Sequence, residues 1–454
     1  MDLFVENVRC FAGRHVAPLA PITLLVGENS SGKSTLVAMA RIAWDAMSRW
    51  DLLDFNEEPF RLGAFDDIVN TTSVKKSESF SVGFRFPPRT TDKRHVSMEL
   101  TEDVEVRIVF TGHDAQPAVS EWTVKCGQYS VSHRASATRD EGEPLLNIQG
   151  PRTDLNFKAR DLPMAPSVLA ICRHWHFFSM RMTSDAKNLF GAEKGKPVAR
   201  EDLEILELML NSVDAALRSG RPYASAPIRT KPTRTYDPLT DKPTPEGGHV
   251  PMMLAKLTGG KPTAGTEKSL MDALHKFGSA AGLFKSIKVK RMGGADERSG
   301  ASDASLPFQI RVSMDDGPSF NLVDVGYGVS QVLPILVDAM MNRQRMVLLQ
   351  QPEVHLHPKA QAELGSFLAK LATGHQAAPI IIETHSDYLI DRIRMDIRDK
   401  RGVTGKNVRI LYCSRSSDGV SITPISIDEN GNLVDVPKGY REFFLAEERR
   451  FLQG

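Results

Sequence analysis

The chain begins with short segments in which apolar and polar residues alternate. Residues 3–11 follow this pattern and then turn through Gly13 and Pro18, which is typical of a hairpin. An unbroken apolar run at 22–26 predicts a strand, and residues 36–43 place apolar side chains at helical spacing. The first part of the chain therefore predicts a hairpin, a buried strand and a helix in that order.

Further short alternating runs predict an antiparallel sheet after this helix. They lie at 80–86, 96–100, 104–110 and 119–124. The polar stretch 132–143 predicts a loop, and the apolar stretch 167–182 predicts a buried strand. Leucine and isoleucine at helical spacing predict a helix over 200–217.

The middle of the chain changes in composition. Proline, glycine and threonine are frequent at 220–262, which predicts an extended, ordered loop. A helix, a Gly/Ser/Asp-rich loop and a strand are expected next, at 270–284, 291–305 and 308–313. Beyond them the pattern predicts one helix and two strands, at 333–341, 345–349 and 379–382. Neither long heptads nor an internal repeat is present, so a coiled-coil arm is not expected.

Composition and charge indicate an ordinary folded protein. The chain has 454 residues, of which 41% are hydrophobic and 25% charged, and its formal net charge is +1. This balance gives no global basic field of the kind that nucleic-acid binding proteins carry, although a local patch is compatible with it. The four cysteines show no metal-ligand spacing. With neither a signal-peptide pattern nor a membrane-length apolar run, we expect a cytoplasmic protein with reduced thiols and no membrane partner.

A glycine-rich segment joins the strand at 22–26 to the helix that follows. Its sequence is Gly27-Glu28-Asn29-Ser30-Ser31-Gly32-Lys33-Ser34-Thr35. The glycines let backbone N–H groups turn inward, and the helix adds the positive end of its dipole. Lys33 would reach the outer phosphates, and Ser34 would supply the hydroxyl that such loops place on Mg²⁺. An ordinary turn before a helix is the alternative, but strand, spacing and helix together favour a phosphate-binding loop and hence a nucleoside triphosphate.

Three later segments follow in an order that suits the rest of a nucleotide site. Gly326, Gly328 and Ser330 precede a helical run, and a helix N-terminus attracts anions, although glycines there are common for structural reasons. One strand pattern ends in Gln350-Gln351-Pro352-Glu353 and another in Glu383-Thr384-His385. Ligand groups gather at such strand ends in parallel sheets.

These four motifs together resemble the ATP-binding-cassette (ABC) type ATPases of the overcoming-lysogenization-defect group, which are related to chromosome-maintenance ATPases. The resemblance implies an α/β fold: a P-loop ATPase head with a mixed central sheet, a flanking antiparallel sheet and a helical and loop-rich insertion. It implies a first lobe at 1–160, the insertion at 161–305 and a second lobe with a C-terminal tail at 306–454. It also implies a homodimer or a higher even oligomer, in which ATP lies between the phosphate loop of one copy and the signature helix of the other.

The resemblance also assigns site residues. Nucleotide-binding positions are Gly27, Asn29, Gly32, Lys33, Ser34 and Thr35 in the phosphate loop, and Gly326, Gly328 and Ser330 in the signature, which reaches the partner's γ-phosphate. His385 matches the switch histidine. Ser34 would bind Mg²⁺ directly and Gln350 through water.

The Walker B strand departs from the family. The two acids expected before Pro-Glu, one for the Mg²⁺ shell and one for polarising water, are the amides Gln350 and Gln351. An amide can order a water molecule but cannot take up a proton. Hydrolysis is therefore expected to be slow unless Glu353 or Glu383 substitutes.

Other polar clusters have ordinary explanations. His355 and His357 could form a metal pair, but their place before Pro358 favours hydrogen-bonded residues at a dimer seam, and no zinc is expected. The basic residues of the Pro-rich loop either face nucleic-acid phosphates or belong to a solvated loop, and the second is favoured. They are Arg229, Lys231 and Arg234, and the same two alternatives apply to Lys288, Lys290 and Arg291.

Three candidate functions remain. The first is an ATP-dependent switch or scaffold whose dimerisation controls a separate nuclease or toxin in antiphage defence, a role that the resemblance supplies. The second is a DNA-binding repair or recombination ATPase of the chromosome-maintenance type, and a housekeeping ATPase is a third. The tail from Val403 is too short for a nuclease module, so any cutting is expected to come from a partner.

Overall fold

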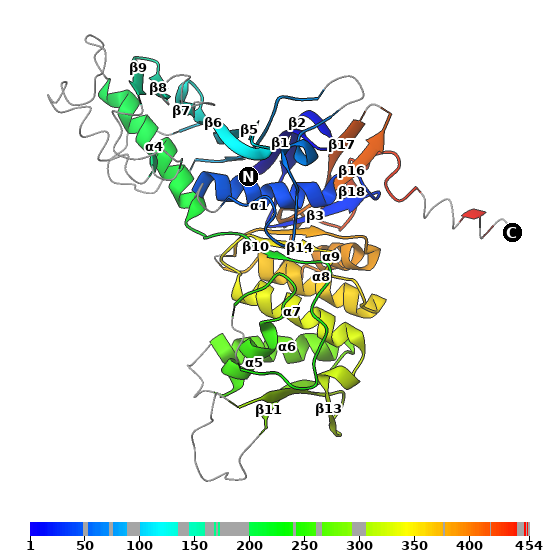
Figure 1. Cartoon of the computed structure of the whole chain (residues 1–454). Helices are drawn as coiled ribbons and strands as arrows, with labels where there is room; N and C mark the ends of the chain where they lie inside the picture. The colour runs from blue at the N-terminus through cyan, green and yellow to red at the C-terminus, as the bar shows by residue number, and fades with distance from the viewer. Residues whose placement is uncertain are drawn as a thin grey trace. The chain divides into compact units, whose positions relative to one another are not determined.

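The chain forms two compact units, each assembled from separate stretches (Figure 1). The computed structural model describes residues 1–48, 53–71, 76–88, 100–134, 145–158, 168, 171–172, 199–238, 242–259, 266–292, 306–375, 377–417, 419–442, 449–450 and 452. The first unit comprises Met1–Leu19, Glu28–Arg221 and Cys413–Thr423, and the second comprises Ala20–Gly27, Pro222–Tyr412 and Pro424–Gly454. The units interleave along the chain, whereas the division expected from sequence has boundaries at residues 160 and 305.

An eight-stranded antiparallel sheet dominates the first unit. Its order is β2-β1-β4-β5-β6-β7-β8-β9. The strands are β1 (Asp2–Val8), β2 (Phe11–Pro18), β4 (Ser79–Phe86), β5 (Val104–His113), β6 (Gln116–Cys126), β7 (Tyr129–Arg134), β8 (Leu145–Gly150) and β9 (Thr153–Lys158). Every second residue of β5 is buried up to Phe110, as one covered face requires. The expected antiparallel sheet is confirmed.

Helices pack on this sheet. They are α1 (Lys33–Ser48), the short α2 (Phe65–Ile68) and α4 (Arg200–Leu217), which runs along β6–β9 in Figure 1. The helix expected at 200–217 is confirmed. The strand expected at 167–182 is not seen where that segment is described, because Val168, Ile171 and Cys172 are helical; an apolar run alone does not separate the two structures. Most of 96–100 and 135–143 lies outside the described residues.

The second unit is built on a seven-stranded mixed sheet of order β10-β14-β15-β3-β16-β17-β18, in which β16 and β17 belong in part to the first unit. Its strands are β3 (Ile22–Gly27), β10 (Tyr223–Ser225), β14 (Val347–Gln350), β15 (Ile380–Glu383), β16 (Val408–Ser416), β17 (Gly419–Ile427) and β18 (Leu433–Val434). The strands β10, β14, β15 and β3 are parallel, and β17 and β18 are antiparallel. Continuous apolar runs in β14 and β15 fit strands buried on both faces. The α/β class with a mixed sheet is confirmed.

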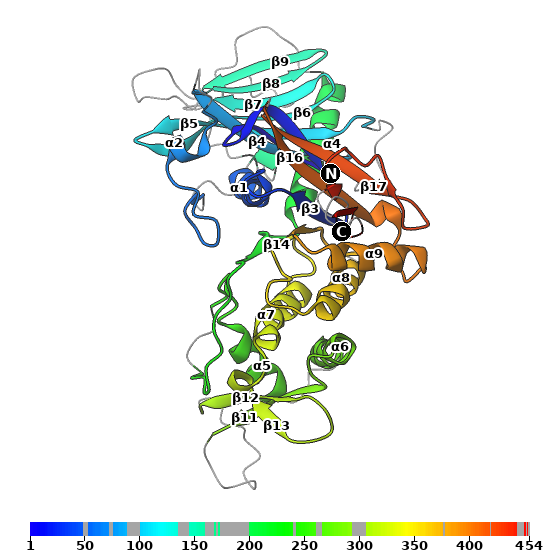
Figure 2. The same ribbon diagram turned by 90° about the vertical axis from the view of Figure 1, so that its right-hand side faces the viewer.

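Helices and a smaller sheet complete the second unit (Figure 2). The helices are α5 (Val250–Gly259), α6 (Thr266–Ala281), α7 (Tyr327–Met341), α8 (Pro358–Ala372) and α9 (Asp387–Arg398), and the small sheet contains β11 (Ser286–Arg291), β12 (Phe308–Ser313) and β13 (Ser319–Asn321). The segment 220–262 is therefore not a simple loop, since it contains β10 and α5. These two elements were not predicted because their apolar stretches are short and are flanked by proline and glycine, which are typical of loops.

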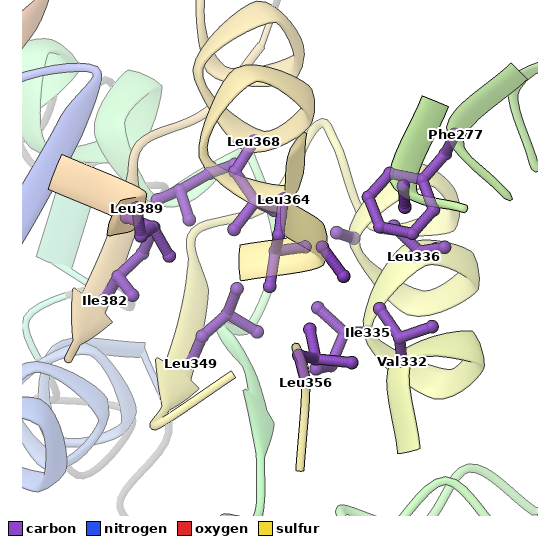
Figure 3. Close-up of a cluster of buried hydrophobic side chains, with 14 of the residues drawn as sticks. Phe277, Val332, Ile335, Leu336, Leu349, Leu356, Leu364, Leu368, Ile382 and Leu389 are labelled. Carbon is purple, nitrogen blue, oxygen red and sulfur yellow. The ribbon is translucent and has the colours of Figure 1, made fainter. Parts of the chain in front are cut away.

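The core of the second unit lies between its sheet and its helices (Figure 3). Leu349 and Ile382 from the sheet, Leu364 from α8, Ile335 from α7 and Phe277 from α6 belong to one buried cluster. Burying such side chains contributes about 1.5–3 kcal/mol each. This core fixes α7 and α8 against the strands whose ends carry the candidate site. Within the described parts of the chain, no helix combines the length and apolar character that crossing a bilayer requires.

Candidate functional site

Four parallel strands of the second unit end at one edge of the sheet. Gln350 pairs with Glu383, and Glu383 pairs with Leu25. The N–H of Thr384 also donates to the Leu25 carbonyl at 3.1 Å. The Walker B turn, the switch loop and the residue from which the phosphate loop departs, Gly27, therefore share the edge where parallel sheets bind ligands.

The phosphate loop has the backbone of an anion-binding turn. Gly27, Ser30 and Gly32 have φ values of +134°, +60° and +91°, a region that L-residues with side chains rarely occupy. A Cβ on Gly32 would lie 2.4 Å from the Phe11 ring. The Ser31 hydroxyl donates to the Glu28 carbonyl at 2.7 Å, which closes the turn from within.

Lys33 begins α1 and folds over the loop. Its Nζ donates to the Glu28 carbonyl at 2.5 Å, and its side chain is buried. The Leu36 N–H donates to the Gly32 carbonyl at 3.0 Å, so the helix starts directly from the loop. Ser34 and Asn29 are exposed, whereas Thr35 is buried. A helix N-terminus, a lysine ammonium and an exposed hydroxyl together suit a Mg²⁺-bound polyphosphate.

The signature glycines begin α7. Gly326 is the residue before the helix, and nothing lies within 4 Å of a Cβ built on it. A Cβ on Gly328 would lie 3.0 Å from the His355 carbonyl oxygen, and the Tyr327 and His355 rings meet edge to face at 5.0 Å. The Ser330 hydroxyl is buried and donates to the Tyr327 carbonyl at 2.8 Å. Gly326 and Tyr327 are therefore the exposed residues of this segment, and Ser330 would have to rotate to reach a phosphate.

The Walker B turn follows β14. Gln350 is 8% exposed, Gln351 has a φ of +42°, and the Gln351 N–H donates to the Glu383 carbonyl at 2.8 Å. Glu353, which is 6% exposed, accepts the backbone N–H of His385 at 2.8 Å on Oε1. Burial raises the pKa of the Glu353 carboxyl, although its hydrogen bonds oppose the shift. The structure thus brings Gln350, Gln351, Glu353 and His385 together.

The switch loop exposes its histidine. The His385 side chain is exposed, while Ser386 begins α9 as its N-cap and accepts the Leu389 N–H at 3.1 Å. The Ser386 hydroxyl also donates to Gln361 Oε1 at 2.6 Å, and Gln361 Nε2 donates to the Leu356 carbonyl at 2.9 Å. Gln361 and Glu353 therefore tie the switch loop to the Walker B turn from two sides, while His385 can still meet a ligand.

One buried arginine contacts the Walker B turn and was not among the site residues assigned from the sequence. Arg229 is 3% exposed, and its Nη2 donates to the Gln350 carbonyl at 3.3 Å and to the Gln351 carbonyl at 3.2 Å. Burial lowers the pKa of its guanidinium to about 10, against the effect of the nearby Glu353 charge. The solvated-loop interpretation is wrong for Arg229, but Lys231 and Arg234 are exposed, and Arg234 pairs with Asp324 at 2.6 Å.

Metal-ligand chemistry is limited at this edge. His357 is the N-cap of α8 and accepts the Lys359 N–H at 3.3 Å on Nδ1, so it has a structural role. Among the described residues, no group of three or more His, Cys, Asp or Glu could hold a metal ion. Gln350 would offer Mg²⁺ only a neutral amide oxygen beside the Arg229 cation. The residues present fit Mg²⁺ at Ser34 and do not fit it at Gln350.

A known family matches part of the chain. Residues 248–391 match the family described as "AAA domain, putative AbiEii toxin, Type IV TA system". This segment is related to AAA-type ATPase domains. The AAA-related segment contains the signature, Walker B and switch residues, whereas the phosphate loop lies before it.

Among solved structures, three chromosome-maintenance (SMC) heads match at 11% identity. They are an SMC head bound to the C-winged helix domain of ScpA (TM-score 0.41; 94% of this chain and 98% of that chain), a head with an extended coiled coil bound to the C-terminal domain of ScpA derived from Pyrococcus furiosus (0.40; 99% and 98%), and the head domain from Thermotoga maritima (0.37; 94% and 98%). No curated protein matches the chain significantly. We therefore argue function from this chain's own residues.

Proposed function

We propose that this chain is an ATP-binding switch whose nucleotide-dependent dimerisation controls a separate effector. The observation that carries the proposal is the phosphate loop, in which three positive φ values, the buried Lys33 and the start of α1 support the binding of an anion. ATP would be held there with Mg²⁺ on Ser34.

A second copy of the chain would complete the site. Support comes from the start of α7, where Gly326 and Tyr327 are exposed residues and the helix carries the positive end of its dipole. ATP bound across such a junction would favour the dimer only through contacts that the monomer lacks. The resemblance of the four motifs to ABC-type ATPases supports the same head-to-tail arrangement.

Hydrolysis would be slow. Gln350 and Gln351 cannot accept a proton, and Glu353, the carboxylate of this turn, already accepts the His385 N–H. We expect turnover well below about 1 per second, the lower end of ordinary enzymes. Slow turnover prolongs a closed state, which suits a switch better than a motor.

The effector is proposed to be a nuclease or toxin encoded separately, as part of antiphage defence. The description of the matching family gives the AAA domain itself as a putative toxin of a Type IV TA system, so the separate effector is carried by the resemblance of the motifs and not by this match. Within residues 403–442, the described residues form the strands β16–β18 and their connections, and we assign no cutting activity to them.

Light scattering on the purified full chain tests the proposal. Without nucleotide the mass should be near the 50.2 kDa of one chain, and saturating ATP should double it. Lys33→Ala should remain monomeric with ATP because it lacks the phosphate-binding ammonium. ATP binding by Lys33→Ala with unchanged affinity would contradict the site assignment.

A DNA-binding repair ATPase is the second candidate. It is favoured by the small sheet, where exposed Lys288 on β11 pairs in register with Arg311 on β12, and exposed Lys290 lies next along the same face. Such a face could contact phosphates. Duplex affinity that falls steeply with salt, and falls further in Lys288→Gln/Lys290→Gln, would favour this candidate.

A further inference from the structure

Three residues spaced four apart lie on one face of α7, and each has a different neighbour. Asp338, near the end of the helix, accepts the Tyr223 hydroxyl at 2.5 Å. Pro334 lies against Gly247, on which a Cβ would be 2.3 Å from the Pro334 Cβ. Ser330, one of the signature residues, lines a cavity of about 40 Å³. Contact along this face therefore decreases from the end of the helix towards the signature.

A buried network fixes the end of α7. The Thr244 N–H donates to Nδ1 of His249 at 3.2 Å, so Nε2 is the nitrogen that donates to Asp338, at 2.9 Å. Both carboxylate oxygens of Asp338 therefore accept a hydrogen bond, one from β10 and one from the residue before α5. Burial and the Asp338 charge raise the pKa of Tyr223, so its phenol remains a donor. Because Asp338 and His249 are 2% and 3% exposed, this fully bonded network holds its three elements in one geometry.

The first half of α7 is held less firmly. Pro334 has no N–H, so the Ser330 carbonyl lacks the donor that a residue four positions later provides elsewhere in a helix. The cavity beside Ser330, whose other walls include Thr230 and Pro251, has room for roughly three water molecules. Towards the core, α7 packs through apolar side chains such as Val332 (Figure 3), and apolar contacts have no preferred direction.

We propose that α7 has two parts: the Asp338 network fixes the second half, and the first half, which carries the signature, turns about Pro334. Asp338 is then a positioning residue and Pro334 a hinge, and all of these contacts lie within the second unit. The use of the hinge rests on the proposed function. A second copy that brings ATP to the start of α7 would select one tilt of the first half, and this tilt costs less than in an unbroken helix because one helix hydrogen bond is already missing.

Hydrogen exchange of the full chain without nucleotide tests the hinge, and it does so independently of ATP. The comparison is between amides 331–333 of α7 and amides 362–364, which occupy the same positions of α8. In the wild type, amides 331–333 should exchange roughly fivefold faster or more. Pro334→Ala restores the donor to the Ser330 carbonyl and should remove most of this difference. Equal exchange of the two sets in the wild type would overturn the hinge.

Pro251→Ala is the matched control for the hinge variant. Pro251 lines the same cavity but is the second residue of α5, where a missing N–H costs the helix no hydrogen bond. This variant should leave exchange at 331–333 and ATP-dependent dimerisation unchanged. Melting temperatures of all variants identify any loss of folding.

Tyr223→Phe tests the network, because it removes one donor to Asp338 and keeps the ring. Exchange of amides 336–341 should rise by roughly fivefold, the effect of one net hydrogen bond. A folded variant with unchanged exchange there would overturn the assignment of Asp338 as the residue that fixes the second half.

The use of the hinge is tested by two measurements on the same variants. Light scattering with ATP over a range of protein concentrations gives dimer affinity, and a fluorescent ATP analogue gives nucleotide affinity at concentrations too low for dimerisation. Pro334→Ala should dimerise roughly fivefold more weakly, because its restored hydrogen bond opposes the tilt, and should bind the analogue like the wild type. Tyr223→Phe should show the same split, since the first half then turns on a looser base.

The two failures are distinguishable. A folded Pro334→Ala that dimerises as tightly as the wild type would overturn the role of the hinge in dimerisation. A wild type that neither binds the analogue nor dimerises would remove the proposed function instead, and the exchange comparison would still decide whether α7 turns about Pro334.

Discussion

Replacing Arg221 by alanine should destabilise the first unit, because this residue connects α1 to two other segments. Arg221 Nε and Nη2 donate to the two Asp45 oxygens at 2.7 and 2.6 Å, and its Nη1 donates to Glu57 Oε1 at 3.0 Å. Arg41 also donates to Asp45 and Glu57, at 3.2 and 3.1 Å. Two arginines and two carboxylates thus form one charge-balanced cluster. Two of its members, Arg41 and Asp45, belong to α1, the helix that begins with Lys33.

The magnitude follows from burial. The side chain of Asp45 is 2% exposed and that of Arg221 is 28% exposed, so the pair is mostly removed from water. Removing one partner of a buried pair costs about 3–5 kcal/mol. Because Arg41 still faces Asp45 and Arg221 keeps some solvent contact, we expect about 2–3 kcal/mol.

Urea denaturation followed by circular dichroism measures this change. Arg218→Ala is the matched control, because Arg218 pairs with Asp214 through a side chain that is 74% exposed, and it should cost less than about 0.5 kcal/mol. Arg221→Lys should fall between the two, since lysine keeps the charge and loses the two-pronged contact. A folded Arg221→Ala whose stability equals that of Arg218→Ala would refute the reasoning.

Three further changes have expected outcomes. Gly32→Ala should lower ATP affinity by roughly tenfold or more in calorimetry, because its Cβ would meet the Phe11 ring at a φ of +91°; unchanged affinity would exclude the loop geometry. His133→Phe should abolish an acid-dependent loss of stability. Burial against Trp122 lowers the pKa of His133 to about 4 from 6.5, so the wild type should lose about 2–3 kcal/mol in denaturant titrations as pH falls from 6.5 to 4, and parallel curves would contradict this. Gly328→Val should bind ATP and remain monomeric in light scattering, since its side chain would meet the His355 carbonyl and cover the start of α7.

Local spacing explains what the sequence predicts well. The phosphate-loop motif is a run of nine consecutive residues that starts at the end of β3, at Gly27, and continues into α1, which begins at Lys33. The strand ends that carry Gln350 and His385 follow from short apolar runs in the same way. The pairing of β14 with β15, which places Gln350 beside Glu383, could not be predicted from the sequence, because register between distant strands leaves no local pattern.

Long-range contacts explain what was missed. Arg229 reaches the Gln350 carbonyl across 121 positions of sequence, and its burial depends on the pairing of β10 with β14, which brings Ser225 beside Leu349. A basic residue in a Pro-rich stretch carries no sign of such a partner. The orientation of the buried Ser330 hydroxyl is likewise set by its hydrogen bond within the first turn of its own helix. A sequence motif does not predict such a rotamer.

A mixing experiment with two defective variants tests the central claim most directly. Lys33→Ala lacks a working phosphate loop and Gly328→Val lacks a working signature. Each variant by itself should therefore remain monomeric when ATP is added. In a head-to-tail dimer, one Lys33→Ala chain and one Gly328→Val chain form a single intact junction from the loop of one and the helix of the other. The account predicts that the mixture with ATP yields a species of twice the 50.2 kDa chain mass, with one ATP bound per two chains. A mixture that stays monomeric while the wild type dimerises would contradict it.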